Sequence, residues 1–486
     1  MSASSGIEWP ESCGGKTTVV AKGVWQKCAE AGGDAALAEA IKNEKNWRFG
    51  YPPHIQRIAE LLTTDKASAI CAAGLRELRE QLAFRSEGKV CSLAELAEKE
   101  PSTTSGYFTT TAVNGKLKEA AAPGVPYGSN LSGAALEKQL GEWASKGTCE
   151  GDVPGRIMEG MKKSGEISGK WFVLLGAGSE MGPLQPLLQN GANVLAVRTR
   201  RPKEWAEMKK FTENETCGKL FIPVDKSGAE GADILKEPLE IRDWVLAVLK
   251  EHAANLQDVT VGMYTYLDSE AHVRVTMGCD IIMEGIQKAL KGVKVRLAYL
   301  CTNSMPLPIG KEAYDSVEKN RNLAGLWARG TGCPSPALSD CGDGLYLYHS
   351  IVVTQGPNYM LAKMAQLWRA MLCDYASLNV APACYTLSVT HSATMKYLLN
   401  AMHLLPPNES FDPKAAKWLL FYLLCYDCLA GGDVVPKKRP VEVALTGSFH
   451  GGALRCGYNI EASKALSGML YFYGRMFSES GPKKAE

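Results

Sequence analysis

Tyr359 and Lys363 are the two residues whose types and spacing point most directly to chemistry. They lie four positions apart in a segment with helical periodicity, residues 358–372, so both side chains point to one side of a helix. An ammonium about 4 Å from a phenol contributes roughly 4 kcal/mol at an effective dielectric constant of about 20, on the order of three pKa units. Tyr359 would then be a general acid and base near neutral pH, unless it is an ordinary helix-surface tyrosine. In the rival pair, Tyr314 and Lys319, one extra residue turns the lysine away from the tyrosine.

A glycine-rich turn follows residues 171–175, a short apolar run typical of a buried parallel strand. Glycines allow a tight turn and let backbone N–H groups approach a pyrophosphate, which then lies at the N-terminus of the next helix. The spacing G-x-G-x-x-x-G is one residue longer than the strict dinucleotide-binding pattern. We expect a cofactor diphosphate to contact the turn residues Gly176, Gly178, Ser179, Met181 and Gly182.

Three arginines end the next apolar segment, which reads as a second buried strand within residues 191–201. An acidic residue at this position selects NAD by holding the ribose 2′-hydroxyl, whereas arginine suits a 2′-phosphate. Arg198, Arg200 and Arg201 therefore favour NADP, with NAD as second choice. The alternative is a solvated strand end.

Strands alternate with helices through the middle of the chain, which favours an open parallel sheet covered by helices on both faces. Ligands bind such sheets at the carboxyl ends of the strands. Further strands are expected at residues 218–225, 259–266 and 293–300, and further helices at residues 202–211, 232–253 and 275–290.

The chain divides into three parts by composition and periodicity. Residues 1–150 form a helical N-terminal region, residues 151–405 a dinucleotide-binding and catalytic domain, and residues 406–486 a C-terminal α/β extension. The expected elements outside the middle part are helices at residues 35–42, 53–62, 66–84 and 136–143, a loop at 101–132, a helix at 417–430 with Asp412 as N-cap and Pro413 at its first position, a strand at 441–445 and a helix at 460–476.

The segment that holds Tyr359 and Lys363 resembles the Tyr-x-x-x-Lys helix of the short-chain dehydrogenase/reductase superfamily. The glycine turn is similar to the TGxxxGxG turn of that family, although Glu180 replaces the middle glycine. The likeness extends over residues 169–405 and implies a Rossmann-type, doubly wound parallel α/β sheet. The flanking parts would be extensions of that core.

The same resemblance assigns roles to further residues. Ser304, with Thr302 as second choice, would stabilise developing charge on the substrate oxygen. Lys363 would also hold the nicotinamide ribose, Asp225 would contact the adenine, and Pro382 would precede the nicotinamide site. Asp280 is near the position of a proton-relay asparagine in the family, as a guess.

The resemblance implies an NADP-dependent oxidoreductase that interconverts a carbonyl and an alcohol. The chain departs from the family in three places: Glu180, the absent Asn-Asn-Ala-Gly after the fourth strand, and the 54 residues between Ser304 and Tyr359. These departures leave two alternative functions open. One alternative is a non-catalytic binding or structural subunit of a larger assembly. The other is an extended-type nucleotide-sugar epimerase or dehydratase. The insertion would be a substrate lid or a partner surface over the site.

Composition limits the remaining possibilities. A formal charge of +2 over 486 residues gives no basic excess for nucleic acid, and the longest apolar run is too short for a transmembrane segment. Fifteen cysteines without repeated spacing favour a reducing compartment, and Cys425 and Cys428 favour core packing over metal binding. We expect a cytoplasmic protein without a metal, able to form a homo-oligomer, in which His450 is structural.

Overall fold

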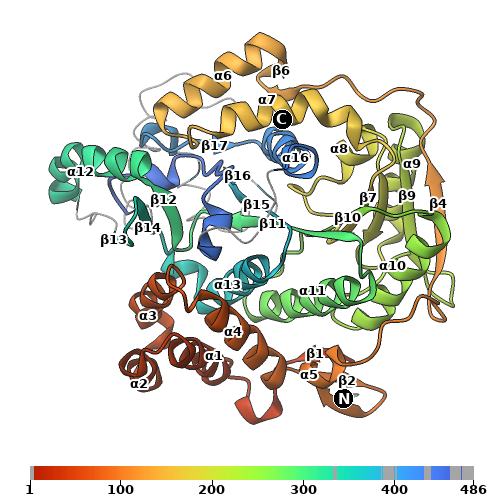
Figure 1. Cartoon of the computed structure of the whole chain (residues 1–486), viewed down its shortest axis with the longest axis horizontal. Coiled ribbons are helices and arrows are strands. Elements are labelled where there is room, and N and C mark those ends of the chain that lie inside the picture. Colours follow the sequence, from red (N-terminus) through yellow and green to blue (C-terminus); the bar gives the residue numbers. More distant parts are fainter. Residues whose placement is uncertain are drawn as a thin grey trace.

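The computed structural model describes residues 5–331, 337–384, 386, 399, 402–431, 439–459 and 472, with side chains except those of residues 322–331 and 404. Its centre is a mostly parallel sheet of seven strands, ordered β15-β11-β10-β7-β8-β9-β4 (Figure 1). Only β4 runs antiparallel, beside β9 at one edge. The strands are β4 (Thr109–Asn114), β7 (Trp171–Leu175), β8 (Asn193–Val197), β9 (Lys219–Val224), β10 (Asp258–Met263), β11 (Lys294–Thr302) and β15 (Ala376–Ala381). The predicted parallel strands are therefore confirmed, and β4 comes from within the region 1–150.

After the edge strand β4, the parallel strands begin in the middle of the sheet, at β7, and move outward through β8 to β9. It then returns to the other side of β7 and continues outward through β10, β11 and β15. Strand order thus reverses between β7 and β10. The connections after these two strands leave in opposite directions, which opens a crevice at their carboxyl ends where ligands of such sheets bind.

Helices cover both faces of this sheet. In Figure 1, α10, α11 and α13 lie below it, and α7, α8 and α16 lie above it. Side chains of β7 alternate between two cores: Val173 and Leu175 belong to the lower one, Phe172 and Leu174 to the upper one. Burial on both faces explains the unbroken apolar run. The helices are α6 (Gly133–Lys146), α7 (Val153–Lys163), α8 (Leu184–Gln189), α9 (Pro202–Glu215), α10 (Pro238–His252), α11 (Glu270–Ala289), α13 (Pro357–Leu372) and α16 (Pro413–Leu429).

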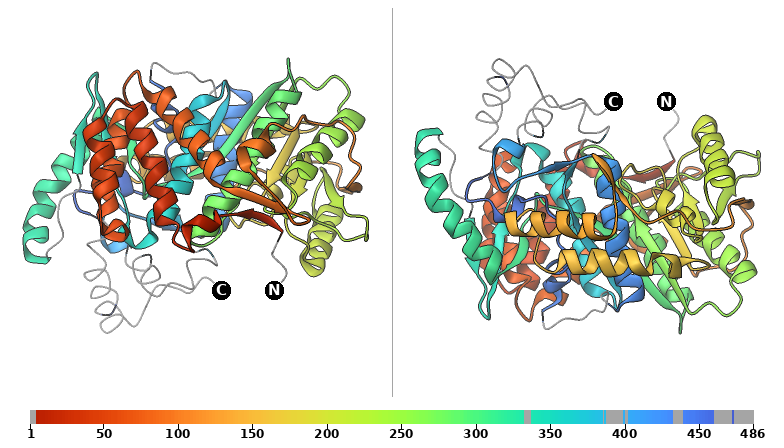
Figure 2. Two further views of the ribbon diagram at one scale, coloured as in Figure 1. Left: turned by 90° about the horizontal axis from the view of Figure 1, so that it is seen from below. Right: turned by 90° about the horizontal axis from the view of Figure 1, so that it is seen from above.

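The N-terminal helices form a further layer against α13 (Figures 1 and 2). They are α1 (Thr18–Ala31), α2 (Ala35–Asn43), α3 (Trp47–Leu61), α4 (Ala67–Gln81) and α5 (Leu93–Ala97). Gly74 of α4 allows close packing, since a Cβ there would come within 2.5 Å of the Trp368 ring. The helices predicted at 35–42 and 66–84 are confirmed. The helix expected at 53–62 begins earlier, at Trp47, so its two prolines lie inside it.

The insertion between Ser304 and Tyr359 forms a small antiparallel sheet of its own, ordered β12-β14-β13, with a long helix. It lies at the left of Figure 1. Its elements are β12 (Leu307–Gly310), α12 (Lys311–Thr331), β13 (Ala337–Asp340) and β14 (Leu345–His349). The remaining short strands are β1 (Gly6–Glu8), β2 (Ala83–Ser86), β3 (Lys89–Ser92), β5 (Val125–Tyr127), β6 (Ser129–Leu131), β16 (Ala383–Cys384) and β17 (Ser410–Phe411).

The C-terminal part is integrated into the core. Helix α16 packs against α7 and β15, and Asp412 caps it by accepting a hydrogen bond from the Lys414 N–H, as predicted. The strand expected at residues 441–445 is wrong, because the segment is a 3₁₀ helix, η5 (Pro440–Ala444). It lies beside β15, but Pro440 has no N–H to donate to a sheet. The helix predicted at 460–476 lies outside the described residues, apart from Phe472.

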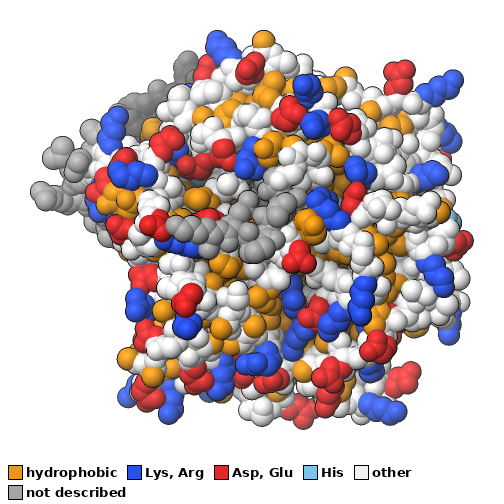
Figure 3. Space-filling model, viewed as in Figure 1, with side chains coloured by type: hydrophobic (Ala, Val, Ile, Leu, Met, Phe, Trp, Pro, Cys, Tyr) orange, Lys and Arg blue, Asp and Glu red, His pale blue; other side chains and the backbone are white. Residues whose placement is uncertain are grey.

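Charges of both signs are interspersed over the face in Figure 3. This agrees with the small formal charge of +2 for the whole chain. That face therefore presents no single-sign field that would attract a highly charged polymer.

Candidate functional site

The phenol of Tyr359 meets two hydroxyl groups from the end of β11. Tyr359 lies in the first turn of α13, and Thr302 and Ser304 lie close enough to its phenol to lower its pKa. The Ser304 and Thr302 hydroxyls are 2.8 Å apart, and Ser304 also donates to Gln355 Oε1 at 2.6 Å. The structure thus brings together the tyrosine and both hydroxyl residues that the sequence suggested.

Lys363 lies one helical turn after Tyr359, with its amine 6.0 Å from the centre of the phenol ring. The amine donates to the Leu300 carbonyl at 3.3 Å and to Gln366 Oε1 at 3.2 Å. Both acceptors are neutral. The ammonium therefore lies in a partly buried place where its described hydrogen-bond partners carry no opposite charge.

Burial controls the titration of this group of residues. It raises the pKa of Tyr359 to about 12, although Thr302 and Ser304 act in the lowering direction. Burial also lowers the pKa of Lys363 to about 8. The expectation that Lys363 brings the Tyr359 pKa near 7 is wrong for this arrangement, because the amine is farther away than assumed and desolvation of the phenol dominates.

The glycine turn after β7 packs against the loop that follows β10. Gly176 has a positive φ of 89°, and a Cβ there would lie 2.7 Å from the Thr265 nitrogen, so only glycine fits. The N–H of Ser179 donates to Gly176 and that of Gly182 donates to Ser179, at 3.0 and 3.1 Å. These two N–H groups therefore shape the turn itself, and Met181 lines the crevice beside it.

Arg198 lies directly against this turn. A Cβ on Gly178 would come within 2.8 Å of its guanidinium carbon, and within the described residues its buried Nε has no hydrogen-bond partner. Burial and the nearby charge of Arg201 lower the pKa of Arg198. Glu204 forms ion pairs with both arginines. The unused Nε donor of Arg198 beside the glycine turn has the chemistry to contact an anionic oxygen such as that of a phosphate, while Glu204 already balances the charge of the guanidinium.

Arg200 and Asp225 satisfy each other instead of facing the turn. Arg200 donates to Asp225 at 2.8 Å and to both carboxylate oxygens of Glu237. Asp225 accepts further hydrogen bonds from Ser227. Both residues of this pair were predicted to contact the nucleotide, yet the described structure gives them an ion pair that ties β8 to β9 and α10.

A small crevice lies between the glycine turn and the carboxyl end of β11. Met181 and Pro183 from the glycine turn line it, together with Tyr264, Leu300, Asn379 and Leu420. Because the Leu300 carbonyl accepts the hydrogen bond of Lys363, the glycine turn and the tyrosine–lysine pair lie at the same edge of the sheet. The crevice is smaller than a typical ligand pocket.

Residues 447–452 form a wall that the sequence did not reveal. Asn303 donates to the His450 carbonyl at 3.0 Å, and a Cβ on Gly451 would lie 3.2 Å from Pro382. This segment therefore lies along the carboxyl ends of β11 and β15, next to Ser304 and the expected nicotinamide position. The glycine-rich string was visible in the sequence, but nothing there indicated which strands it contacts.

The relay position also differs from the expectation. Asp280 accepts hydrogen bonds from Arg79 and Arg369 and is buried with them, so its suggested relay role is wrong. Gln366, which contacts Lys363, lies 3.5 Å from the Thr276 hydroxyl of α11. Gln366 and Thr276 thus provide the polar contact between Lys363 and α11, in the place where we expected Asp280 to act.

His272 of α11 is a second residue that sequence analysis missed. Its ring stacks on Tyr359, with centres 5.6 Å apart and planes at 15°. The exposed ring of Tyr266 packs against both, at 5.2 and 6.3 Å. A lone histidine in a helix carries no signal in a single sequence, and only the packing of α11 on α13 brings it to the phenol.

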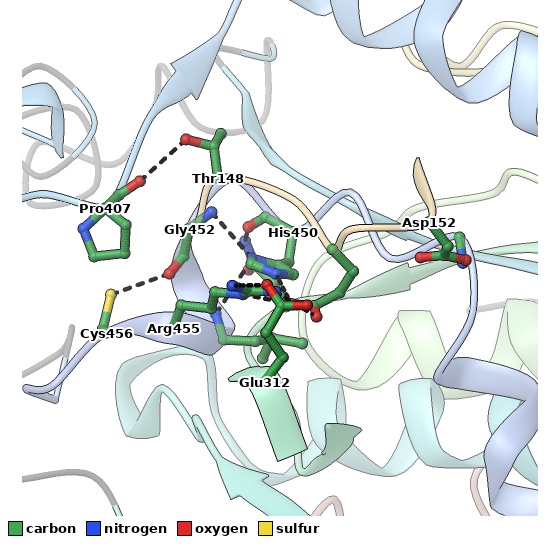
Figure 4. A network of polar contacts seen from close by, with 12 residues as sticks. Thr148, Asp152, Glu312, Pro407, His450, Gly452, Arg455 and Cys456 are labelled. Atoms are coloured by element: carbon green, nitrogen blue, oxygen red, sulfur yellow. Dashed lines mark hydrogen bonds and ion pairs between the residues drawn. The ribbon is translucent and has the colours of Figure 1, made fainter. Parts of the chain in front are cut away.

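His450 belongs to a different polar cluster, in which it and Arg455 contact the largely buried Glu150, and Arg455 also reaches the exposed Glu312; Figure 4 shows His450, Arg455 and Glu312. His450 lies 2.9 Å from Glu150 through Nε2 and accepts the Gly452 N–H through Nδ1 at 3.0 Å. Arg455 donates to both oxygens of Glu150 and to Glu312. Burial acts to raise the pKa of Glu150, but hydrogen bonds from His450 and Arg455 outweigh it and lower the pKa to about 2. This Glu150 cluster joins residues 149–152, α12 and the C-terminal part.

Three other observations bear on ligands and location. Across the part of the chain that the structure describes, no group of three or more histidine, cysteine, aspartate or glutamate side chains could hold a metal ion. The cysteines described are free thiols, including Cys425 and Cys428 in α16. No helix among the described residues is both long and apolar enough to cross a membrane.

Comparison of the chain with protein-family models, with curated proteins and with solved structures gave no match.

Proposed function

We propose that this protein is an NADP-dependent oxidoreductase of the short-chain dehydrogenase/reductase type, which interconverts a carbonyl and an alcohol on a small molecule. The strand order β9-β8-β7-β10-β11-β15 supports this proposal, since it equals the 3-2-1-4-5-6 order of a Rossmann-type sheet. The free thiols of the described cysteines support a reducing compartment such as the cytoplasm.

One observation carries the proposal. Ser304, Tyr359 and Lys363 come from separate positions along the chain and meet at the carboxyl edge of the sheet, beside the crevice that reaches the glycine turn. A phenol, a hydroxyl and an amine in this arrangement suit proton transfer to or from a carbonyl oxygen.

Each of these residues has a role that its contacts support. The phenol of Tyr359 would donate a proton to the substrate oxygen during reduction and accept it during oxidation. Ser304 would turn its hydroxyl from Gln355 to that oxygen and stabilise its charge. Lys363 would hold the nicotinamide ribose of the nucleotide. Arg198 would hold the 2′-phosphate that distinguishes NADP from NAD. The nicotinamide would supply the hydride.

A second candidate function, nucleotide binding without turnover, is favoured by the electrostatics. Burial raises the pKa of Tyr359 to about 12, and Ser304 already has a short hydrogen bond to Gln355. Such a phenol is a weak acid that stays protonated at neutral pH, so it neither gives up its proton readily nor acts as a base unless a bound ligand brings a positive charge near it.

Nucleotide binding and turnover separate these candidates. We expect the purified protein to change the fluorescence of NADPH more strongly than that of NADH, and to oxidise NADPH with at least one member of a panel of aldehydes, ketones and quinones. Fluorescence change without turnover on the panel would select the binding function. No change with either nucleotide would reject both.

A further inference from the structure

The histidine that stacks on Tyr359 has a polar atom with no described use. His272 is fully buried, and within the described residues its Nε2 has no hydrogen-bond partner. Its other nitrogen, Nδ1, lies 3.4 Å from the Leu267 N–H, which can only donate. We therefore assign the proton of the neutral ring to Nε2, which leaves a buried N–H without an acceptor.

The surroundings of the ring favour this neutral form. Burial and the charge of Lys363 hold the pKa of His272 well below its usual value. The groups that face it from neighbouring elements are the Tyr359 phenol and the Lys363 amine from α13 and Tyr266 from the loop before α11. Tyr266 has a hydrogen bond of its own to Asp268. The neighbourhood thus contains an ammonium and two phenols, and none of its contacts described here supplies an acceptor to Nε2.

A buried N–H without a partner destabilises a folded protein, so it calls for a functional or structural reason. Two hydrogen-bond donors, His272 Nε2 and the Lys363 amine, lie near the candidate catalytic phenol, and the lysine charge is close enough to act on the imidazole. An oxygen that enters this neighbourhood would find an N–H ready to donate to it. A hydroxyl or carbonyl oxygen has this chemistry, and a further cation does not.

We propose that His272 is a positioning residue of this site, which fixes the Tyr359 phenol by stacking and donates its Nε2–H to a hydroxyl or carbonyl oxygen of the bound ligand. This inference rests on the proposed function. The oxygen belongs either to the nucleotide or to the carbonyl substrate. The ring of Tyr266, which is 48% exposed, covers the imidazole and would move aside as the ligand enters.

Three substitutions separate stacking from hydrogen bonding. His272→Phe keeps an aromatic ring and removes both nitrogens, His272→Gln keeps an N–H donor at the reach of Nε2, and His272→Asn keeps a polar group only near Nδ1. His252→Gln is the matched control. His252 also packs on an aromatic ring, Phe221 at 5.3 Å, but it ends α10 at the opposite edge of the sheet.

The readouts are NADPH affinity by fluorescence, kcat and KM for the best carbonyl of the panel, and thermal unfolding as a check on folding. We expect His272→Phe and His272→Asn to lose roughly three- to tenfold in one of these constants, His272→Gln to recover most of that loss, and His252→Gln to match the wild type. A loss in NADPH affinity assigns the oxygen to the nucleotide, and a loss in KM or kcat assigns it to the substrate.

A second measurement is independent of the variants. In protein labelled with ¹⁵N-histidine, the resonance that disappears in His272→Gln should show a protonated Nε2 and an unprotonated Nδ1, and its Nε2 proton should shift when NADPH or the carbonyl binds. If the protein binds NADPH and turns over while His272→Phe equals the wild type and this resonance does not move, the positioning role is wrong and the proposed function stands. If the protein binds neither nucleotide, the proposed function fails and this inference fails with it.

Discussion

Two polar clusters of this protein differ in how their charges are matched. In the Glu150 cluster, the carboxylate lies between His450 and Arg455, and each polar contact pairs a donor with an acceptor (Figure 4). Around Tyr359, the Lys363 amine has only a carbonyl and an amide as described acceptors, and the Nε2 of His272 has no described acceptor. The first cluster lowers the pKa of its acid, and the second raises the pKa of its phenol.

This difference teaches how to tell a structural cluster from a functional one. Matched charges hold three parts of the chain together and leave nothing for a ligand to satisfy. Mismatched charges cost stability, and such groups gather where a protein binds or transforms something. Removing a charge should therefore destabilise the Glu150 cluster and stabilise the cluster around Tyr359.

The largest expected effect is on turnover. Tyr359→Phe should lower kcat by about 10²- to 10⁴-fold, because it removes the proton that the substrate oxygen needs. NADPH oxidation with the active carbonyl measures this. Tyr314→Phe is the control, since that ring stacks on Tyr346 in the insertion at 4.0 Å and should leave kcat unchanged. Unchanged turnover in Tyr359→Phe would show that Tyr359 is not the proton donor, and the cluster around it would then have no catalytic role.

The next effect is on stability. Glu150→Ala should lower the free energy of unfolding by about 3–5 kcal/mol, because it leaves Arg455 buried without its main partner. Denaturant unfolding measures the change. Glu312→Ala is the control: it removes the other partner of Arg455, but its side chain is 72% exposed, so it should cost less than about 1 kcal/mol. If both variants lost the same free energy of unfolding, the buried ion pair of Glu150 would contribute no more to stability than the exposed ion pair of Glu312.

The pH dependence of unfolding tests the same cluster. The Glu150 pKa is lowered from 4.5 to about 2, so its contribution is fully present above pH 4.5 and is lost as the pH falls toward 2. This amounts to about 3 kcal/mol. Glu150→Gln should make unfolding less dependent on pH in that window. An unchanged slope would mean that other carboxylates control acid unfolding.

Lys363→Met should have the opposite sign. The Lys363 pKa is lowered from 10.5 to about 8, so the buried ammonium destabilises the fold below pH 8, and the penalty disappears as the pH rises toward 10.5. The variant should gain about 2–3 kcal/mol at pH 7 and nothing at high pH. Lys319→Met, at an exposed position, should change little. A net loss at pH 7 would show that the hydrogen bonds to Leu300 and Gln366 outweigh the cost of burial.

The smallest predicted effect concerns the nucleotide. Arg198→Ala should weaken NADPH binding by about 10- to 100-fold and leave NADH binding unchanged, because it removes the charged partner of the extra phosphate. Arg200→Ala should lower stability without changing this selectivity, since its guanidinium is paired with Asp225 and Glu237. Loss of NADPH selectivity in Arg200→Ala instead would reverse the assignment of the two arginines.

Sequence patterns predicted the elements that depend on local composition. The strand at residues 171–175 and the helix with Tyr359 and Lys363 were placed within a residue, because an apolar run and a helical repeat each report on burial. The meeting of Ser304 with Tyr359 was expected from the family resemblance and the order of strands. The direction in which the Tyr359 pKa shifts was not predictable, since it depends on how deeply packing buries the phenol.

Pairings between distant residues were beyond the sequence. Arg200 could have faced a phosphate or a carboxylate, and only the fold brings Asp225 and Glu237 to it. His272 gave no signal because its partner lies on another helix. The segment 441–445 has strand-like residues, but Pro440 before it has no N–H to donate to a sheet, and the segment is a 3₁₀ helix beside β15.

The contact between α4 and α13 has a practical consequence for anyone who shortens this chain. Asp280 is held by Arg79 from one side and by Arg369 from the other, at 2.5 and 2.6 Å. Arg369 and Tyr359 are on the same helix. Deleting the first hundred residues would thus strip a counter-ion and uncover Trp368 on the helix that carries the phenol, so a trimmed protein would report on damage and not on a minimal enzyme.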